Sequence, residues 1–301
     1  FTVAERRLVS DAVLAKCDAL DGASDGLVAD TAACQAAFDL SRDVPTCSGA
    51  RDGTCLSAAQ KATIAQLFEG VRTRSGTTLY APFPYDAGLA TGDWASWKFV
   101  APSTRDAGAI GIVWQVPPAN PSAFDARAFM LAADVDALLA RVQATNATYA
   151  QSAVDFMTPP HLQNYSGVRR HGGRIVMYHG TSDPIFSSAH SVSVYEGWSR
   201  GSGAPASSFA RLYLVPGMNH CRGGPSADAV DFLGPLVEWV ESGRAPEAVI
   251  ASVRGPGDPA GVNADLPPSW SASRTRLLCP WPRTAHYVGG DLESAGSFTC
   301  R

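Results

Sequence analysis

The sequence predicts an α/β fold, and three observations support this class. Two short apolar runs, 174–178 and 211–215, have the length and composition of buried strands. A helical pattern over 188–198 separates them, as expected for alternating strands and helices. Each run ends in a glycine-containing turn that carries one polar residue, Asp183 in the first and His220 in the second.

Asp183 and His220 are the candidate catalytic residues. Ligands of open α/β sheets bind at the carboxyl ends of the strands, so these side chains could meet although 37 positions (220 − 183) separate them. An acid and then a histidine, each after a strand, is the order found in α/β-hydrolases. His220 would be the general base, and Asp183 would hold its tautomer. Alternatively, Asp-Pro forms an ordinary turn, and the histidine binds a metal or packs in the core.

That order also requires a nucleophilic serine on a Gly-x-Ser-x-Gly turn between a strand and a helix. Ser24 in 22–26 matches the letters, but no apolar strand precedes it and nearby carboxylates would oppose an oxyanion. Ser199 in 197–201 follows a helical pattern and comes after Asp183. We therefore expect the nucleophile upstream of Phe1, on an N-terminal segment or a separate chain.

Composition limits the class of protein. The 301 residues are 46% hydrophobic and 17% charged, enough for a large core and about two domains. The net charge of −4, without a basic block, argues against nucleic-acid binding. No apolar run reaches the ~18 residues of a membrane span. No signal peptide is recognisable, and Phe1 in place of a start methionine fits a processed or truncated chain.

Seven cysteines predict disulfides, and therefore a secreted or periplasmic protein. Three local pairs suggest themselves: Cys17–Cys34, Cys47–Cys55 and Cys279–Cys300. The alternative is a set of reduced, buried thiols in a cytosolic protein. Cys221 is left over beside His220, and it requires a partner outside this chain.

The N-terminal part predicts a helix over 1–16, followed by an acidic loop. No cation lies between Lys16 and Arg42, yet four aspartates do (Asp18, Asp21, Asp25 and Asp30). Oxygen ligands at this spacing suit Ca²⁺. The loop begins like an EF-hand, but Ala32 stands where the bidentate glutamate belongs, so a different calcium loop is predicted. The alternative is a solvated acidic turn.

The middle of the chain is the least regular. Ser57 and Gln60 form a capping box for a helix, whose buried stripe we expect from Ile64, Leu67, Phe68 and Val71. Residues 75–122 are predicted to be irregular and are rich in aromatics. They form either a lid over a substrate pocket or the core of a loop-rich domain. A helix is predicted over 134–142, and the prolines at 159–160 mark a boundary.

The C-terminal part completes the α/β pattern. A helix is predicted over 227–242, with Ser226 as N-cap, Gly243 as stop and a core face of Val230, Leu233, Val237 and Val240. Residues 249–253 predict a strand, and the tail is rich in loops.

Three stretches together resemble the tannase and feruloyl esterase family. They are Cys-Asp-Ala-Leu-Asp-Gly-x-x-Asp-Gly at 17–26, Gly-Gly-Arg-Ile-Val-Met-Tyr-His-Gly-x-x-Asp at 172–183 and Gly-Met-Asn-His-Cys at 217–221. The resemblance implies a serine esterase acting on aromatic esters of hydroxycinnamate, gallate or terephthalate type. It also implies an α/β-hydrolase core with a large inserted, calcium-binding lid. Residues 1–16 would be a core helix, 17–165 the lid, and 166–301 the C-terminal half of the core.

The resemblance also implies roles for single residues. Asp183 and His220 become the triad acid and base, and Cys221 pairs with a cysteine directly before the nucleophilic serine. His179 and Phe186 line the substrate pocket. Calcium is held by the side chains of Asp18, Asp21 and Asp25 and by the backbone oxygens of Ala23 and Leu27.

Two questions about the lid stay open. Trp114 is a candidate substrate-binding residue there, and Arg105 or Arg127 could meet a substrate carboxylate. In the alternative function, the protein is a catalytically inactive, calcium-stabilised module. Its aromatic surface around Trp94, Trp97 and Trp114 would then bind phenolic or glycan ligands.

Overall fold

The computed structural model describes all 301 residues, which form two compact units. The first comprises Phe1–Glu69, Pro82–Trp94 and Gln163–Arg301, and the second comprises Gly70–Ala81 and Ala95–Leu162. This division groups residues 17–69 and 82–94 with the C-terminal part, whereas the prediction assigned them to a lid.

The first unit begins with a capped helix, as predicted. Helix α1 (Val3–Cys17) starts at a capping box in which Thr2 and Glu5 bond each other's backbone amides. A 3₁₀ turn, η1 (Asp18–Asp21), follows, and then come the short helices α2 (Thr31–Ala37) and α3 (Leu40–Asp43). Helix α4 (Ala58–Phe68) carries the predicted capping box of Ser57 and Gln60 and buries Ile64 and Phe68.

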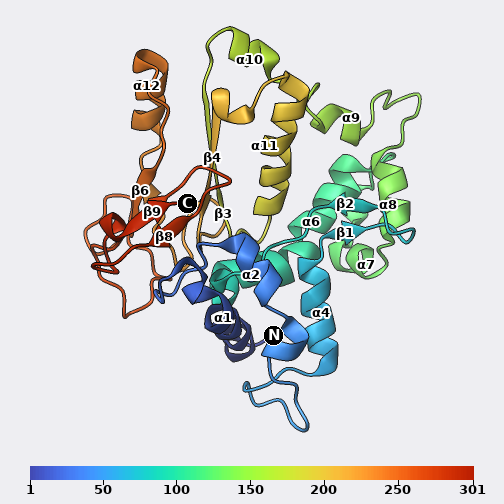
Figure 1. The fold of residues 1–301 in the computed structure, drawn as a ribbon. Coiled ribbons are helices and arrows are strands. Elements are labelled where there is room, and N and C mark those ends of the chain that lie inside the picture. Colours follow the sequence, from blue (N-terminus) through green and yellow to red (C-terminus); the bar gives the residue numbers. More distant parts are fainter. The chain divides into compact units, whose positions relative to one another are not determined.

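A pair of parallel strands forms the centre of the first unit (Figure 1). Strand β3 (Ile175–Gly180) pairs with β4 (Ala210–Val215) in unbroken register. The connection between them is α11 (Ser188–Ser202), which begins at Ser187 and ends at the left-handed Gly203. Both predicted strands and the helix between them are confirmed. The predicted burial holds for β4, where Leu212 and Tyr213 are fully buried, but it is wrong for β3, which is only partly buried and exposes Tyr178.

The C-terminal part adds two small antiparallel sheets. The first runs β5 (Ala229–Val230), β6 (Val249–Ser252), β7 (Thr275–Leu278), and the second pairs β8 (Ala285–Tyr287) with β9 (Phe298–Cys300). Strand β6 was predicted; β7, β8 and β9 fall in the tail predicted to be loops. Short turns complete this unit: η2 (Ala87–Ala90), α5 (Gly92–Ala95), α10 (Ser166–Arg170), η7 (Ala206–Ser208) and η8 (Ala295–Ser297).

The helix predicted over 227–242 is shorter, and its predicted core face is wrong. Helix α12 (Leu233–Ser242) starts six residues late, because Ala229 and Val230 pair with β6 as strand β5. The carboxylate of Asp231, not Ser226, accepts the amides of Leu233 and Gly234 at the helix start. The end at Gly243 is confirmed. Three residues of the predicted core face are exposed (Leu233, Val237 and Val240), and Trp239 is the buried residue of this helix.

The second unit is built from short elements. Strands β1 (Val71–Arg72) and β2 (Thr78–Tyr80) form a hairpin, so Val71 does not belong to the buried stripe of α4. The helices are α6 (Arg105–Gly108), α7 (Ala126–Leu131), α8 (Val135–Val142) and α9 (Ala153–Met157). Helix α8 confirms the prediction over 134–142. Residues 75–122 are less irregular than predicted, since they include helical turns at η3 (Ser96–Val100), η4 (Ala101–Ser103), η5 (Ala109–Trp114) and η6 (Pro121–Ala123).

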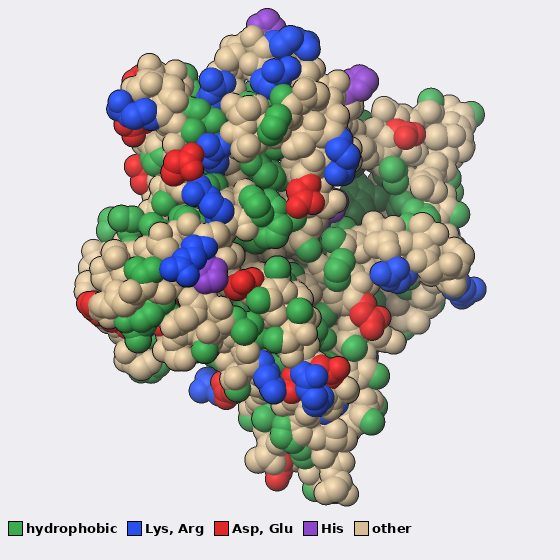
Figure 2. All heavy atoms as spheres, viewed as in Figure 1, with side chains coloured by type: hydrophobic (Ala, Val, Ile, Leu, Met, Phe, Trp, Pro, Cys, Tyr) green, Lys and Arg blue, Asp and Glu red, His purple; other side chains and the backbone are tan.

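All three predicted disulfides form, linking Cys17 to Cys34, Cys47 to Cys55 and Cys279 to Cys300. Cys221 is exposed and is the free cysteine. None of the helices combines the length and the apolar character that crossing a membrane requires. On the face drawn in Figure 2, positive and negative side chains are interspersed among apolar and uncharged surface.

Candidate active site

The parallel pairing of β3 and β4 brings the two candidate catalytic residues together. Gly180 pairs with Val215, so both strands end at the same edge of the sheet. The turns that follow carry Asp183 and His220, and Nδ1 of His220 lies 3.0 Å from Oδ2 of Asp183. The structure therefore places this carboxylate and this imidazole in hydrogen-bonding contact, as the order of strands predicts.

The carboxylate of Asp183 is held in a fixed orientation. Its Oδ1 accepts the backbone amides of Ile185 at 2.8 Å and Phe186 at 2.9 Å, which leaves Oδ2 facing His220. The side chain is only 5% exposed. Burial alone would raise the pKa of Asp183, but hydrogen bonds from His179, His220 and the two amides hold that pKa below its usual range. The carboxylate is thus kept ionised beside the imidazole.

Two residues predicted to line the pocket lie beside this pair. Nε2 of His179 is 3.3 Å from Oδ2 of Asp183 and 2.9 Å from the carbonyl of Phe186, and its Nδ1 contacts Oγ of Ser191 at 2.7 Å. The exposed ring of Phe186 packs against His220, with centroids 5.5 Å apart. The side chain of His220 is 29% exposed, so its ring is accessible from solvent.

The two turns meet so closely that glycine is required. A Cβ at Gly180 would lie 2.1 Å from the carbonyl oxygen of Met218, and the amide of Ser182 donates to this same oxygen at 3.1 Å. Gly217, with φ at +71°, opens the second turn. A cavity of about 420 Å³ lies beside His220 and is lined by residues that include Asn219 and Arg222.

The acidic loop predicted to bind calcium folds around its own backbone amides. Oδ1 of Asp18 accepts the amides of Asp25 at 2.8 Å and Gly26 at 3.0 Å, and Oδ1 of Asp21 accepts the amide of Ala23. Burial raises the pKa of Asp21 to about 6, and the charges of Asp25 and Asp18 add to this increase. The loop therefore concentrates negative charge in a buried place.

Cations from the distant C-terminal part balance some of the negative charge of these aspartates. Arg276 on β7 donates to Oδ2 of Asp25 at 2.6 and 2.9 Å, and Arg274 donates to the carbonyl of Asp25 at 2.7 Å. Burial raises the pKa of Asp25, and the charge of Arg276 opposes this increase. These cations come from some 250 residues further along the chain, and no local pattern identifies them.

The donor chemistry of the loop nevertheless fits a hard cation. Ala23 and Leu27 are buried residues of this loop, and each contributes a backbone carbonyl oxygen. Together with the aspartates they offer only oxygen ligands, as Ca²⁺ prefers. The structure contains no group of three His, Cys, Asp or Glu side chains that could hold a metal ion, so a site here would depend on the backbone oxygens. Calcium binding stays a prediction.

Comparison with known proteins identifies the family. The family model described as tannase and feruloyl esterase matches residues 2–301. The chain belongs to the tannase and feruloyl esterase family.

Relatives within the tannase and feruloyl esterase family are longer than this chain. The mono(2-hydroxyethyl) terephthalate hydrolase of Piscinibacter sakaiensis is 36% identical over 326 residues, which cover 100% of this chain and 52% of the relative. A probable feruloyl esterase of Arthroderma benhamiae is 28% identical and covers 95% of this chain and 50% of its own length. The chain thus spans about half the length of the curated relatives it matches.

Solved structures from this group share the fold. Feruloyl esterase B from Aspergillus oryzae superposes with a TM-score of 0.74 at 22% identity, covering 100% of this chain and 57% of that chain. A tannin acyl hydrolase from Aspergillus niger gives a TM-score of 0.59 at 18% identity. These likenesses show the fold, which is of the α/β-hydrolase type.

Neither serine in a Gly-x-Ser-x-Gly sequence lies on the strand-to-helix turn that is typical of an α/β-hydrolase nucleophile. Ser24 follows the 3₁₀ turn η1 rather than a strand. Ser199 lies within α11, where its Oγ accepts the amide of Ala206 at 2.9 Å. Both observations agree with the sequence argument against these two residues.

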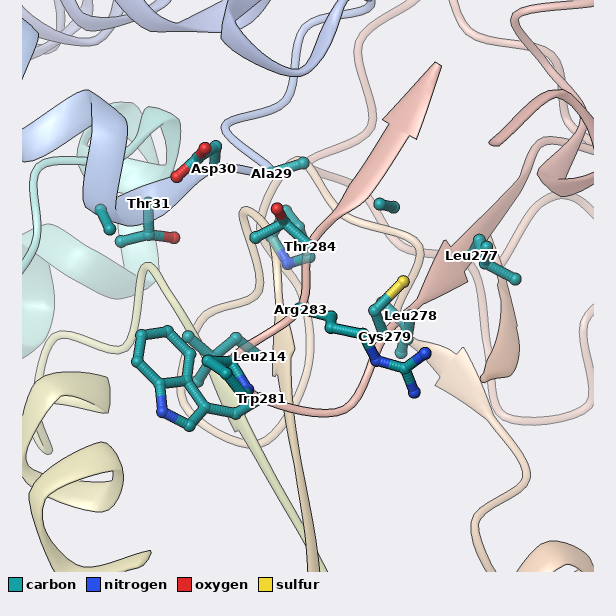
Figure 3. Close-up of a pocket in the computed structure, with 14 residues that line it drawn as sticks. Ala29, Asp30, Thr31, Leu214, Leu277, Leu278, Cys279, Trp281, Arg283 and Thr284 are labelled. Carbon is teal, nitrogen blue, oxygen red and sulfur yellow. The ribbon is translucent and has the colours of Figure 1, made fainter. Parts of the chain in front are cut away.

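The remaining predicted residues lie elsewhere. Trp114 is 40% exposed and belongs to the second unit, as does Arg105, whose guanidinium stacks 3.4 Å above the ring centre of Trp97. A separate cavity of about 130 Å³ lies between Leu214, Trp281 and Cys279 on one side and Asp30 and Thr31 on the other (Figure 3). None of the predicted site residues lines this cavity.

Proposed function

We propose that the complete protein is a carboxylic ester hydrolase of the serine type, acting on esters of aromatic acids. The observation that supports this most strongly is the contact between Asp183 and His220 at the ends of two adjacent parallel strands. An imidazole whose Nδ1 is held by an ionised, buried carboxylate can accept a proton at Nε2. Membership of the tannase and feruloyl esterase family supports the same chemistry.

The proposed reaction has two acyl-transfer steps. Nε2 of His220 takes the proton from a serine Oγ as this oxygen attacks the ester carbonyl. The same proton then passes to the departing alcohol, and an acyl-enzyme is left. A water molecule, deprotonated by His220, releases the acid and restores the serine. Throughout the cycle, Asp183 stabilises the charged imidazolium and fixes its orientation.

We propose that the serine comes from a part of the protein outside these 301 residues. Ser24 and Ser199 both lack the strand-to-helix turn, and the family relatives have a further half of their length to supply one. Cys221 directly follows His220 and is exposed and free. A disulfide from Cys221 to a cysteine beside the nucleophile would fix the serine next to the base.

An aromatic acyl group is proposed because of the surface beside His220. The exposed ring of Phe186 lies against the imidazole and offers an aromatic face to a planar substrate. Two relatives are a mono(2-hydroxyethyl) terephthalate hydrolase and a probable feruloyl esterase, and terephthalate and ferulate are aromatic acids. His179 and Phe186 are the proposed substrate-binding residues of the first unit, and a substrate-binding role for Trp114, in the second unit, stays a prediction.

We also propose a structural calcium ion in the acidic loop and an extracellular or periplasmic location. The ion would cross-link the loop through Asp18, Asp21 and Asp25 and the carbonyls of Ala23 and Leu27, without taking part in the reaction. The three disulfides support an oxidising compartment.

The proposed function is tested by the hydrolysis of methyl ferulate by the complete protein. His220→Ala is expected to abolish turnover. The matched control is His171→Ala, because His171 is an exposed histidine at the end of α10. Unchanged turnover in the His220 variant would contradict the proposal, and so would a wild-type protein that binds aromatic esters without cleaving them.

A further inference from the structure

A third segment contacts both turns of the candidate site. This segment, Asp86–Thr91, contains the short turn η2 and belongs to the first unit. It lies on α1, where Oγ of Ser10 donates to the carbonyl of Ala87 and Arg6 donates to the carbonyl of Ala90. Nothing in its sequence suggested a functional role.

Asp86 contacts the start of each turn. Its Oδ2 accepts the amide of Gly217 at 3.5 Å, and Gly217 opens the turn that carries His220. The side chains of Thr181 and Ser182, which directly precede Asp183, lower the pKa of the Asp86 carboxylate, and the hydroxyl of Thr181 donates to the carbonyl of Val215 at the end of β4, 3.3 Å away. Oγ1 of Thr181 in turn accepts the amide of Gly217 at 3.0 Å. One carboxylate and one hydroxyl thus connect the acid turn with the base turn.

Gly88 and Thr91 of the same segment bind the residues that directly precede the catalytic pair. The amide of Gly88 donates to Oγ of Ser182 at 3.0 Å, and Nδ2 of Asn219 donates to Oγ1 of Thr91 at 2.9 Å. A Cβ at Gly88 would lie 2.4 Å from Cβ of Ser182 and 2.8 Å from Oδ1 of Asn219. Ser182 and Asn219 are the residues immediately before Asp183 and His220.

The burial of Asp86 argues that this contact is needed. The residue is 3% exposed, and no Lys, Arg or His forms an ion pair with it. A buried carboxylate without a cation costs free energy, which only its hydrogen bonds offset. Burial accordingly raises the pKa of Asp86, and the hydrogen bonds from Thr181 and the backbone oppose the increase. An apolar residue would fill this place at lower cost if filling space were its only role.

We propose that Asp86, acting through Thr181 and Gly217, is a positioning residue that sets the distance between Asp183 and His220. The inference rests on the proposed ester hydrolysis, since it assigns Asp86 a role in that reaction. Asp86 touches neither catalytic side chain directly. Its carboxylate fixes the backbone from which each of them projects, and a displacement of about 1 Å in such a pair can lower the rate about a hundredfold.

The test measures kcat and KM for methyl ferulate in variants of the complete protein. Asp86→Asn keeps the shape but removes the charge and can present a donor where the amide of Gly217 needs an acceptor. Thr181→Val removes the hydroxyl that joins the turns, and Thr181→Ser keeps it. Thr63→Val on the exposed side of α4 is the matched control. Circular dichroism and melting temperature report the folded fraction.

We expect kcat to fall between about tenfold and a hundredfold in Asp86→Asn and Thr181→Val, with KM within about twofold of wild type. Thr181→Ser is expected to keep kcat within about threefold of wild type. If Asp86→Asn does not fold, the Thr181 pair decides the question alone. Wild-type kcat in Thr181→Val, or an equal loss in both Thr181 variants, would overturn the inference.

His220→Ala, measured alongside, separates this inference from the proposed function. An inactive His220→Ala together with fully active Asp86→Asn and Thr181→Val would refute the positioning role and leave the proposed hydrolysis intact. An active His220→Ala would refute the proposed hydrolysis itself.

Discussion

Oδ2 of Asp183 lies 3.0 Å from Nδ1 of His220, although 37 positions of sequence separate the two residues. The other oxygen of this carboxylate is bound by two backbone amides, so the carboxylate cannot rotate away without breaking them. The folded turn after β3 therefore holds the Asp183 carboxylate in contact with His220.

The first prediction concerns the charge of Asp183. Asp183→Asn keeps the size of the side chain but removes the charge that stabilises the imidazolium, and it can hold the wrong tautomer of His220. We expect kcat for an aromatic ester to fall roughly 10³- to 10⁴-fold in the complete protein. Asp11→Asn on the exposed side of α1 is the control. A loss of less than tenfold in Asp183→Asn would argue against a catalytic role.

The second prediction concerns the pH dependence of stability. Because the folded-state pKa of Asp183 lies below its usual value, the unfolded state binds more protons between the two pKa values. Asp183 therefore adds stability above its unfolded pKa, near 4, and this contribution is lost as the pH falls through the lower folded value. Denaturant unfolding at pH 6 and pH 3 should show a smaller difference between wild type and Asp183→Asn at pH 3. An equal difference at both pH values would contradict this.

The third prediction concerns Cys221. If the proposed disulfide links Cys221 to a cysteine outside these 301 residues, Cys221 should not react with a thiol reagent in the complete, unreduced protein. Peptide mass spectrometry without reduction should recover the cross-linked pair. Cys221 recovered as a free thiol that reacts with iodoacetamide would exclude this link.

The fourth prediction concerns calcium. Chelation by EGTA should lower the melting temperature of the complete protein by several degrees, because an ion that binds only the folded state stabilises it. Asp18→Asn should remove this dependence, whereas Asp52→Asn, on an exposed loop outside the acidic turn, should keep it. A melting temperature that does not change with EGTA in the wild type would count against the ion.

Much of the first unit could be predicted from sequence, because its signals are local. The strands at β3 and β4 are apolar runs bounded by turns, and the cap of α4 is a short side-chain motif. The three disulfides could also be predicted, because each joins two cysteines that lie close together in the sequence. The meeting of Asp183 and His220 followed from a topological rule, namely that parallel strands end at one edge.

The residues that the sequence analysis missed depend on long-range packing. Arg276 reaches Asp25 across 251 positions, and Asp86 reaches Gly217 across 131. No spacing rule connects such pairs before the fold is known. The core face predicted for α12 was wrong for a related reason. Leu233 and Val240 have the apolar spacing of one helix face, but this spacing does not show whether another element of the fold covers that face.

The most direct measurement treats the complete protein with a fluorophosphonate, which bonds covalently to an activated serine, and identifies the modified residue by peptide mass spectrometry. We predict one modified serine outside residues 1–301, and loss of the modification in His220→Ala. Modification of Ser24, Ser199 or any other serine of these 301 residues, or undiminished labelling in His220→Ala, would contradict the account.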